Sequence, residues 1–595
     1  MQKNKKLISN LKFLLSLAYK QDPVLLWLYF ATTILGVIFM FAVFFGFKLL
    51  IDAIAPTSPS PLFPAIVILT TYLLFEYLSR FVYYTVNNYY ISYVFRSKMQ
   101  NTLTIEVMKK VSNLDLAQIE DGKIRNLITK VFDTYNWTLP EIINTLNYIV
   151  YNTASILLSL LIATRFNPSQ FLLVAVAVAP LFYLRAKYGD AEWSMYGVKS
   201  PRANQLWYLR GLFYENNILT EMKLYGFSNY ILSRMSRLQT EILNAYVSPI
   251  AKYTLHSVVL SILIPIALFI PLKSYINPAQ SGHTIGDFTL LLNVLFSFST
   301  QLSNMLVNVG NLYKNNLYLN DFISLLSIKS ALTMPKKPVI FKTITPRKIV
   351  FDNVTFTYPG SKKPAVKDVS FIIEKGENVA IVGENGAGKT TLIKLLLRFY
   401  DPDEGAIYID GVNLKELDIG NWYRHIGMLF QHFGRYYFTL EENVALGNVL
   451  YPKDKSKISA ALLQADAASI TKELPKGLKN VLGKRFEEGQ DLSTGQWQKV
   501  AIARALYRSA PYLILDEPTA NIDASAEAKI FDNLIKQYKN KSLLFISHRF
   551  STVRHADNII VLHKSQVEAI GSHADLIKQG GLYNKFFSLQ KRGFE

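Results

Sequence analysis

Residues 378–391 read Asn-Val-Ala-Ile-Val-Gly-Glu-Asn-Gly-Ala-Gly-Lys-Thr-Thr, and this stretch decides the fold of the second half of the chain. Five residues with the character of a buried strand run directly into the pattern Gly-x-x-x-x-Gly-Lys-Thr, and residues 391–399 then favour a helix. Glycines allow backbone N–H groups to turn inward around a phosphate, and the N-terminus of the following helix adds a favourable field. The pattern therefore predicts a nucleotide-phosphate site in an α/β domain. Its residues are Gly383, Glu384, Asn385, Gly386, Ala387, Gly388, Lys389, Thr390 and Thr391.

A pair of carboxylates follows a second apolar strand further along the chain. Tyr512–Leu515 has the pattern of a buried strand and ends in two acidic residues, Asp516 and Glu517. We expect Asp516 to hold Mg²⁺ together with the hydroxyl of Thr390, and Glu517 to orient and polarise the attacking water. Paired acids at the end of a strand can also cap a helix, and Pro518 does follow them. Their combination with a phosphate-binding loop favours the catalytic interpretation.

The overall composition points to a membrane protein that carries a soluble part. Of the 595 residues, 50% are hydrophobic, 13% are aromatic and 18% are charged, yet the formal net charge is +20. A soluble chain this apolar would be expected to precipitate, and a disordered chain would lack so many aromatic residues. Nucleic-acid binding would explain the positive charge but not the apolar excess. The absence of cysteine excludes a disulfide framework, thiolate-bound zinc and a thiol nucleophile.

Six apolar segments in the first half are candidates to cross a bilayer, which takes about 20 residues. They are Val24–Ile51, Pro64–Val86, Leu139–Thr164, Phe171–Leu184, Pro249–Leu272 and Ile285–Val309. A stretch rich in proline and lysine, 334–338, ends this pattern. We therefore place a membrane domain at residues 1–335 and the α/β P-loop NTPase domain at residues 341–595.

Basic residues predict how the spans are oriented. The segment between Lys48 and Arg80 contains no lysine or arginine, whereas the N-terminus and the connections 96–135 and 185–252 are rich in both. By the positive-inside rule, these basic segments, both termini and the second half of the chain lie in the cytoplasm. Residues 7–19 are amphipathic and predict a helix on the inner membrane surface. A signal peptide is the alternative, but no small-residue cleavage site follows. The long connections are regular enough to continue the spans as cytoplasmic helices.

The order of motifs in the second half resembles the ATP-binding cassette transporters, in the form of exporters with a membrane domain fused ahead of one cassette. Residues 492–496 read Leu-Ser-Thr-Gly-Gln and resemble the family signature LSGGQ, with Thr494 in place of a glycine. The resemblance implies ATP and Mg²⁺ as ligands and gives further residues a role. These are Tyr358 stacking on adenine, Gln431 sensing Mg²⁺, Ser493, Gly495 and Gln496 on the γ-phosphate of an opposite subunit, Asp523 in the D-loop, and His548 as the switch histidine. Taken singly, Tyr358 could be a packing residue, His548 a structural histidine and Gln431 a loop residue.

The same resemblance predicts the function. One cassette and six spans imply a half-transporter that dimerises, and we expect a homodimer because no catalytic residue is missing. Such a dimer would hydrolyse ATP and export a peptide or amphipathic substrate by alternating access across the cell membrane, in contact with lipids and without nucleic acid. A lipid flippase or a broad multidrug exporter is the alternative. The turns near Leu114–Glu120 and Phe213–Asn217 would be the coupling helices that dock on the cassettes.

Polar residues recur at helical spacing in three of the predicted spans. Polar side chains that face lipid cost free energy, so we expect these stripes to face a water-filled cavity, or alternatively to form hydrogen bonds between helices. The sixth span carries Asn293, Ser297, Thr300, Gln301, Asn304, Asn308 and Asn311; the third carries Asn144, Asn147, Tyr151, Asn152 and Ser155; the second carries Glu76, Arg80, Asn87 and Asn88.

Overall fold

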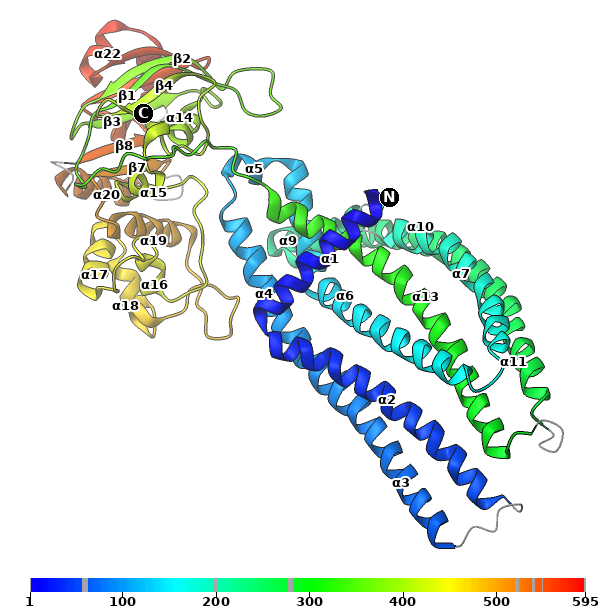
Figure 1. The fold of residues 1–595 in the computed structure, drawn as a ribbon. Coiled ribbons are helices and arrows are strands. Elements are labelled where there is room, and N and C mark those ends of the chain that lie inside the picture. The colour runs from blue at the N-terminus through cyan, green and yellow to red at the C-terminus, as the bar shows by residue number, and fades with distance from the viewer. Residues whose placement is uncertain are drawn as a thin grey trace. The chain divides into compact units, whose positions relative to one another are not determined.

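The chain folds into two compact units. A computed structural model describes residues 2–55, 62–196, 201–276, 282–518, 524–537, 541–547 and 549–592. The first unit contains the chain up to Leu114 and Gly122–Lys329, and the second contains Asp115–Asp121 and the chain from Ser330 onward. The first unit is helical, and the second contains the strands (Figure 1).

The first unit is a bundle of long helices. Its elements are α1 (Gln2–Gln21), α2 (Pro23–Ile54), α3 (Leu62–Arg80), the π-helical η1 (Phe81–Ile91), α4 (Ser92–Ser112), α6 (Gly122–Ala163), α7 (Ser169–Tyr196), α8 (Pro201–Gly211), η2 (Leu212–Tyr214), α9 (Asn216–Tyr225), α10 (Ser228–Ser261), α11 (Leu263–Lys273) and α13 (Ile285–Ser327). Among the described residues, five helical segments are long and apolar enough to span a membrane: Pro23–Ile54, Pro64–Ser112, Gly122–Ala163, Ser228–Lys273 and Ile285–Ser327.

These five segments contain four of the six predicted spans, and a fifth, Leu139–Thr164, ends one residue beyond Gly122–Ala163. The remaining one, predicted at Phe171–Leu184, lies in α7, where the described apolar part Ser169–Leu181 is shorter than a full span. The helices α6 and α13 each exceed 40 residues, whereas about 20 residues are enough to cross a bilayer. These helices therefore extend beyond the membrane, as the sequence predicted. The predicted amphipathic segment 7–19 lies within α1.

The helices α6 and α13 run antiparallel along each other. The Thr153 hydroxyl lies 3.9 Å from the sulfur of Met305, while Arg165 lies near Asp287 at one end of the pair. Their packing divides the polar stripe of the sixth predicted span: Ser297 and Gln301 are buried, whereas Thr300 and Asn304 are exposed. The stripe therefore serves both the helix contact and an exposed face.

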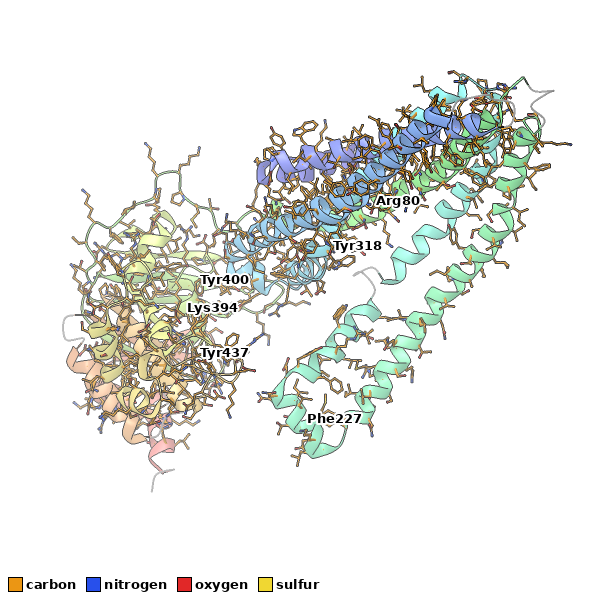
Figure 2. All side chains as sticks on the ribbon, turned by 90° about the horizontal axis from the view of Figure 1, so that it is seen from below. Arg80, Phe227, Tyr318, Lys394, Tyr400 and Tyr437 are labelled. Carbon is orange, nitrogen blue, oxygen red and sulfur yellow. The ribbon has the colours of Figure 1, made fainter. Side chains whose placement is uncertain are left out.

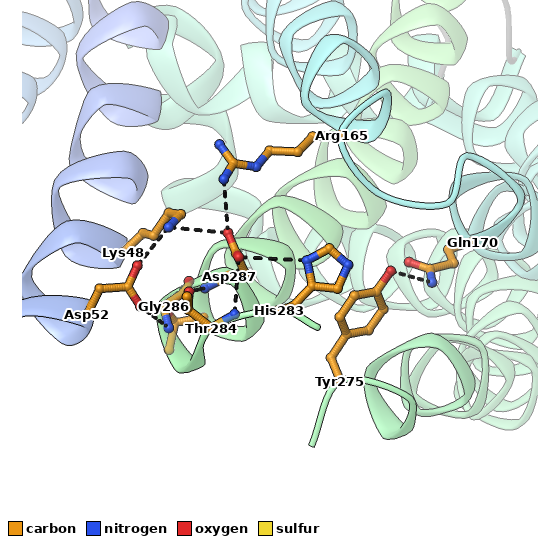
Figure 3. A network of polar contacts seen from close by, with 10 residues as sticks. Lys48, Asp52, Arg165, Gln170, Tyr275, His283, Thr284, Gly286 and Asp287 are labelled. Atoms are coloured by element: carbon orange, nitrogen blue, oxygen red, sulfur yellow. Dashed lines mark hydrogen bonds and ion pairs between the residues drawn. The ribbon is translucent and has the colours of Figure 1, made fainter. Parts of the chain in front are cut away.

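A buried charged cluster joins one end of α2 to the start of α13 (Figure 3). The Lys48 ammonium lies 2.7 Å from Oδ2 of Asp52 and 3.2 Å from Oδ1 of Asp287, and Arg165 lies 3.5 Å from the same Asp287 oxygen. The side chains of Lys48 and Asp287 are each only 8% exposed. Gly286 donates its N–H to Asp52 over 2.9 Å, and a Cβ at Gly286 would stand 2.4 Å from an Asp52 oxygen. The two helices therefore approach as closely as a glycine permits.

The second unit is built on two sheets. Its strands are β1 (Ile349–Phe356), β2 (Val366–Ile373), β3 (Asn378–Gly383), β4 (Glu404–Ile409), β5 (Val412–Asn413), β6 (Ile426–Leu429), β7 (Tyr512–Asp516), β8 (Ser542–Ile546), β9 (Asn558–His563) and β10 (Gln566–Gly571). One sheet is antiparallel with the order β2-β1-β4-β5; the other has the order β10-β9-β3-β8-β7-β6 and is parallel except for β10.

Helices surround these sheets in the second unit (Figure 1). They are α5 (Leu116–Glu120), α14 (Lys389–Leu396), η3 (Leu414–Glu416), α15 (Ile419–Arg424), α16 (Leu440–Ala445), α17 (Lys455–Gln464), α18 (Ala468–Glu473), η4 (Gly477–Lys479), α19 (Thr494–Tyr507), α20 (Ala524–Gln537), α21 (Phe550–Val553), α22 (His573–Gln579) and α23 (Leu582–Arg592). The central parallel strands are almost wholly apolar because both faces of that sheet are covered. Their carboxyl ends meet at one edge, and the candidate site lies there.

Candidate functional site

The predicted phosphate-binding loop connects β3 to α14. Gly383 closes the strand with φ 154°, and a Cβ there would stand 2.4 Å from the carbonyl oxygen of Leu562 in the neighbouring strand β9. Gly388 precedes the helix with φ 101°, and a Cβ there would stand 2.6 Å from the Ala365 carbonyl oxygen. Both positions combine a left-handed or strained backbone with a close approach, so glycine is required at each.

Lys389, the first residue of α14, is folded back on the loop. Its ammonium donates to the carbonyl oxygens of Gly383 over 2.8 Å and of Glu384 over 2.9 Å. The side chain is buried, and burial lowers the pKa of Lys389 from its ordinary value. A desolvated ammonium held only by carbonyl groups gains a stronger partner when a phosphate enters the loop.

Thr390 and Asp516 form the second part of the site. The Thr390 hydroxyl donates to Oδ2 of Asp516 over 3.1 Å, and Asp516 is only 2% exposed at the end of β7. The other carboxylate oxygen, Oδ1, is buried without a hydrogen-bond partner. Burial raises the pKa of Asp516, although the Thr390 hydrogen bond opposes this. An orphaned carboxylate oxygen beside a hydroxyl is a set of hard oxygen ligands, so these residues fit Mg²⁺.

Glu517 lies in a strained conformation next to Asp516. Its φ is 50°, a region that residues other than glycine rarely adopt and that is often found at functional sites. The backbone on both sides is held, since its N–H donates to the Ile546 carbonyl over 3.1 Å and its carbonyl accepts from the Gln498 amide over 3.4 Å. The carboxylate accepts a hydrogen bond of 2.9 Å from Gln431, which follows β6. This geometry fixes the carboxylate at the sheet edge that also carries the phosphate-binding loop.

The structure therefore brings together residues from three separate segments of the chain: the start of α14, the residues after β6 and the end of β7. These residues are Lys389, Thr390, Gln431, Asp516 and Glu517. Gln498 was missed by the sequence analysis. It is buried in α19, and no pattern in the sequence distinguishes it from a packing residue.

The signature-like residues form a separate exposed feature at the start of α19. The Ser493 hydroxyl accepts from the Gln496 N–H over 3.2 Å, and the Gln496 side chain accepts from the Ser493 N–H over 2.9 Å. This reciprocal capping box fixes the helix N-terminus, where Gly495 also lies. Thr494, which stands in place of a family glycine, is exposed in the first turn.

Of the other predicted site residues, Tyr358 is described by the structure, whereas Asp523 and His548 are not. Tyr358 packs edge-on against Phe356 and Tyr400, and its hydroxyl lies 3.2 Å from that of Thr391. It therefore lies beside the helix that begins with Lys389.

The short helix α5, the segment predicted as the first coupling helix, packs in the second unit. Glu120 accepts from the Lys394 ammonium over 3.0 Å and also from the Tyr400 hydroxyl. Lys394 and Tyr400 lie next to each other on this unit (Figure 2), and Leu116 packs against its apolar core. Because Lys394 belongs to α14, the same helix contacts α5 and carries the phosphate-binding lysine.

An open pocket of about 310 Å³ lies in the same unit, close to the segment that carries Gln431. It is lined by apolar and aromatic side chains and by two arginines. The lining consists of Leu397, Phe399, Tyr423, Ile426, Met428, Phe430, Leu446, Gly447, Arg504, Ala505 and Arg508.

Comparison with known proteins identifies relatives of both units. Residues 366–520 match the family described as ABC transporter. The chain is 31% identical to the subtilin transport ATP-binding protein of Bacillus subtilis over 485 residues, which cover 81% of this chain and 78% of that protein. It is 27% identical to the nisin transport ATP-binding protein of Lactococcus lactis subsp. lactis over 501 residues, 84% of this chain and 83% of that protein.

Two further likenesses are informative. The chain is 41% identical over 245 residues to the ATP-dependent lipid A-core flippase of Haemophilus ducreyi, covering 41% of each protein. A structure of a bacterial Atm1-family ABC exporter with ATP bound matches its fold with a TM-score of 0.81 and 22% identity, covering 96% of this chain and all of that one. The fold similarity covers nearly the whole chain, so the helical first half shares its fold with that protein.

Proposed function

Since the chain belongs to the ABC transporter family, as a half-transporter that fuses one membrane domain to one ATP-binding cassette, we propose that two copies of it export an amphipathic peptide. The chain is a multi-pass membrane protein and an ATPase coupled to transport. The observation that carries the proposal is the convergence of Lys389, the Thr390–Asp516 pair and the Gln431–Glu517 pair at one sheet edge, in a chain with membrane-spanning helices.

In the proposed ATP site, the loop N–H groups from Glu384 to Thr391 surround the β- and γ-phosphates. Lys389 leaves the carbonyls of Gly383 and Glu384 and pairs with the phosphate oxygens, and Tyr358 stacks on adenine. Thr390, Asp516 and Gln431 would hold Mg²⁺, which would supply positive charge to offset the charge of the phosphates. The orphaned Oδ1 of Asp516 supports this assignment, because it lacks any other partner.

Glu517 then acts on the water that attacks the γ-phosphate. Its carboxylate, held by Gln431, accepts a hydrogen bond from this water and takes up its proton as the bond to ADP breaks. His548 would contact the γ-phosphate from the segment after β8. The strained backbone of Glu517 supports this role, because it turns the carboxylate away from the strand that positions Asp516.

The second copy completes each site. The exposed N-terminus of α19 favours an anion, and Ser493, Gly495 and Gln496 would face the γ-phosphate held by the opposite cassette. Asp523 would lie at the same dimer contact. The exposed turn at Phe213–Asn217, where Tyr214 protrudes, would dock in the apolar pocket beside Gln431 in the other copy, and its Glu215 complements the two arginines there.

A peptide is the favoured substrate because the two relatives that match most of the chain are named for subtilin and nisin transport. A cavity of about 280 Å³ in the membrane domain supports an amphipathic cargo, since its apolar wall carries three serine hydroxyls. It is lined by Leu181, Tyr253, Ser257, Val258, Ser261, Ser303, Leu306 and Val307. Lipid flipping is the second candidate, because a lipid A-core flippase resembles 41% of the chain. The basic connections support cytoplasmic termini and cassettes in a cell-membrane protein.

The test is ATP hydrolysis by the purified protein in lipid nanodiscs. Amphipathic peptides are expected to stimulate hydrolysis, whereas added lipid A is not; the reverse result would favour the flippase. Glu517→Gln is expected to reduce turnover at least 100-fold while ATP and Mg²⁺ still bind, because only the water-activating group is lost. Hydrolysis at the normal rate in this variant would contradict the assignment of Glu517. Glu568→Gln, the same change at an exposed position of β10 away from the site, is the matched control.

A further inference from the structure

A charged pair lies exposed in the middle of the helix formed by α3, η1 and α4. Arg80 contacts Glu76 through Nε and Nη2, each 2.6 Å from the same carboxylate oxygen. The Arg80 side chain is 74% exposed and that of Glu76 30% exposed. Figure 2 places Arg80 part-way along the helical bundle. Because these contacts use one side of the guanidinium, N–H groups remain available on its exposed side.

Contacts with α2 show that this pair lies at membrane depth. At one end Tyr72 packs beside Phe47, with ring centroids 5.9 Å apart, and at the other end Lys98 pairs with Asp22 over 2.7 Å. Residues 24–47 of α2 carry no charge, so the bilayer covers this stretch. Arg80 lies about 12 Å along the helix from Tyr72 and about 25 Å from Lys98. Both distances place the charged pair inside the hydrocarbon layer.

Exposed charges at this depth are incompatible with a lipid-facing surface. Ionised side chains in membrane segments face a protein interior or a water-filled pathway and mark functional sites. An independent observation supports a functional site here: the π-helical segment η1 begins at Phe81, the residue after Arg80. Such helical turns are rare and occur frequently at functional sites. The buried Asn87 anchors this segment by donating to the Tyr29 carbonyl and to the Thr33 hydroxyl, both over 2.8 Å.

Aromatic rings flank the exposed guanidinium. Tyr77 and Phe81 stack with centroids 5.8 Å apart, and Tyr77 and Tyr84 are 62% and 64% exposed. Tyr77 and Tyr84 share one helix face with Arg80, because they lie three positions before it and four positions after it. A surface with unused guanidinium N–H groups and exposed rings suits a ligand that carries both a carboxylate and apolar side chains.

We propose that Arg80, Tyr77 and Tyr84 form a substrate-binding site in the membrane domain that accepts a carboxylate of the transported peptide. The assignment rests on the proposed peptide export and adds the chemistry of the cargo. Glu76 holds the guanidinium in place when no peptide is bound. The peptide carboxylate joins or replaces it on the exposed side of Arg80, so the charge remains compensated inside the membrane.

Two synthetic peptides of the same amphipathic sequence test this assignment, one with two glutamates and the other with glutamines in their place. For each peptide we consider the concentration that gives half-maximal stimulation of ATP hydrolysis in nanodiscs. The readout is the value for the glutamine peptide divided by the value for the glutamate peptide. This ratio does not depend on the fraction of folded protein. In the wild type the glutamate peptide is expected to act at a concentration at least tenfold lower. Arg80→Gln is expected to bring the ratio close to one, and Arg80→Lys to keep part of it. The exposed Arg96→Gln on the same continuous helix is the control with a wild-type ratio.

Three results would overturn the assignment. If Arg80→Gln kept the wild-type ratio of the two peptide concentrations, the role of Arg80 would be overturned, whereas the proposed peptide export would not be affected. Rapid disulfide formation between two copies of Tyr84→Cys, independent of peptide, would assign this face to the subunit contact; the natural chain has no cysteine to interfere. Failure of both peptides to stimulate the wild type would overturn the proposed peptide export and this site together.

Discussion

Replacing Lys48 with methionine tests whether the charged cluster stabilises the membrane domain. Methionine is similar in length but removes the charge, so Asp52 loses its ion pair, whereas Asp287 keeps Arg165 and, when its imidazole is protonated, His283. At an effective dielectric constant of about 20, the attractions lost amount to about 6 kcal/mol at 2.7 Å and about 5 kcal/mol at 3.2 Å. Burial of the ammonium offsets much of this gain in the wild type.

The net effect is therefore smaller than the Coulomb sum. Removing one member of a buried ion pair costs about 3–5 kcal/mol. Because Arg165 still lies 3.5 Å from Asp287, the lower end of that range is expected. For a unit of this size, a loss of about 3 kcal/mol lowers the unfolding midpoint by about 5 °C. The assay is thermal unfolding of the full chain in nanodiscs, with Lys252→Met as the control, because Lys252 is exposed on α10.

A second variant separates charge balance from lost packing. In Lys48→Met with Asp52→Asn the cluster is neutral again, and the asparagine oxygen can still accept the Gly286 N–H. At least half of the lost stability is expected to return, since the two sites are coupled. The reasoning would be refuted if Lys48→Met had the same unfolding midpoint as the Lys252→Met control. It would also be refuted if the stability losses of Lys48→Met and Asp52→Asn simply added up in the double variant.

Three further predictions concern the second unit. Glu120→Gln is expected to keep ATP binding but to weaken stimulation by peptide severalfold, because the ion pair with Lys394 is lost; full stimulation would show that α5 does not transmit the signal. Thr494→Gly restores the family signature and is expected to raise the maximal ATPase rate with little effect on ATP affinity, measured by steady-state kinetics. Burial lowers the pKa of His573, so the folded state takes up this proton less readily than the unfolded chain and loses stability as pH falls below about 6.5. The thermal midpoint of His573→Gln should fall less between pH 7 and pH 5.5 than that of the wild type, and parallel curves would exclude a role for this histidine.

The sequence predicted that Thr390 and Asp516 would lie close together, because both follow parallel strands whose carboxyl ends share one sheet edge. Once the segment before Gly383 is a parallel strand, the loop leaves the sheet at the edge where the carboxyl end of β7 also lies, with β8 between the two strands. The orphaned oxygen of Asp516 and the hydrogen bond from Gln498 to Glu517 could not be predicted in the same way. They depend on side-chain orientation and on how α19 packs, which local patterns do not encode.

The membrane domain shows where sequence patterns are insufficient. Lys48 interrupts an apolar run, and the sequence gives no reason to pair it with Asp287, which lies more than 200 residues later. The polar stripe on α13 was recognised from its helical period, but the contact with α6 decides that Ser297 is buried and Asn304 exposed. Periodicity identifies the face of a helix, whereas the burial of each residue depends on the neighbouring helix.

The position of α14 gives the cassette a direct mechanical link between ATP and α5. Lys389 begins the helix and would bind the phosphates, and Lys394, on the next turn, pairs with Glu120. The helix core is tightly buried through Leu392 and Leu395, so it moves as a rigid body. Any displacement of the α14 backbone on phosphate binding would therefore reach Lys394 and its contact with α5. In this arrangement nucleotide binding would act on α5, the segment between α4 and α6, through the contact of Lys394 with Glu120.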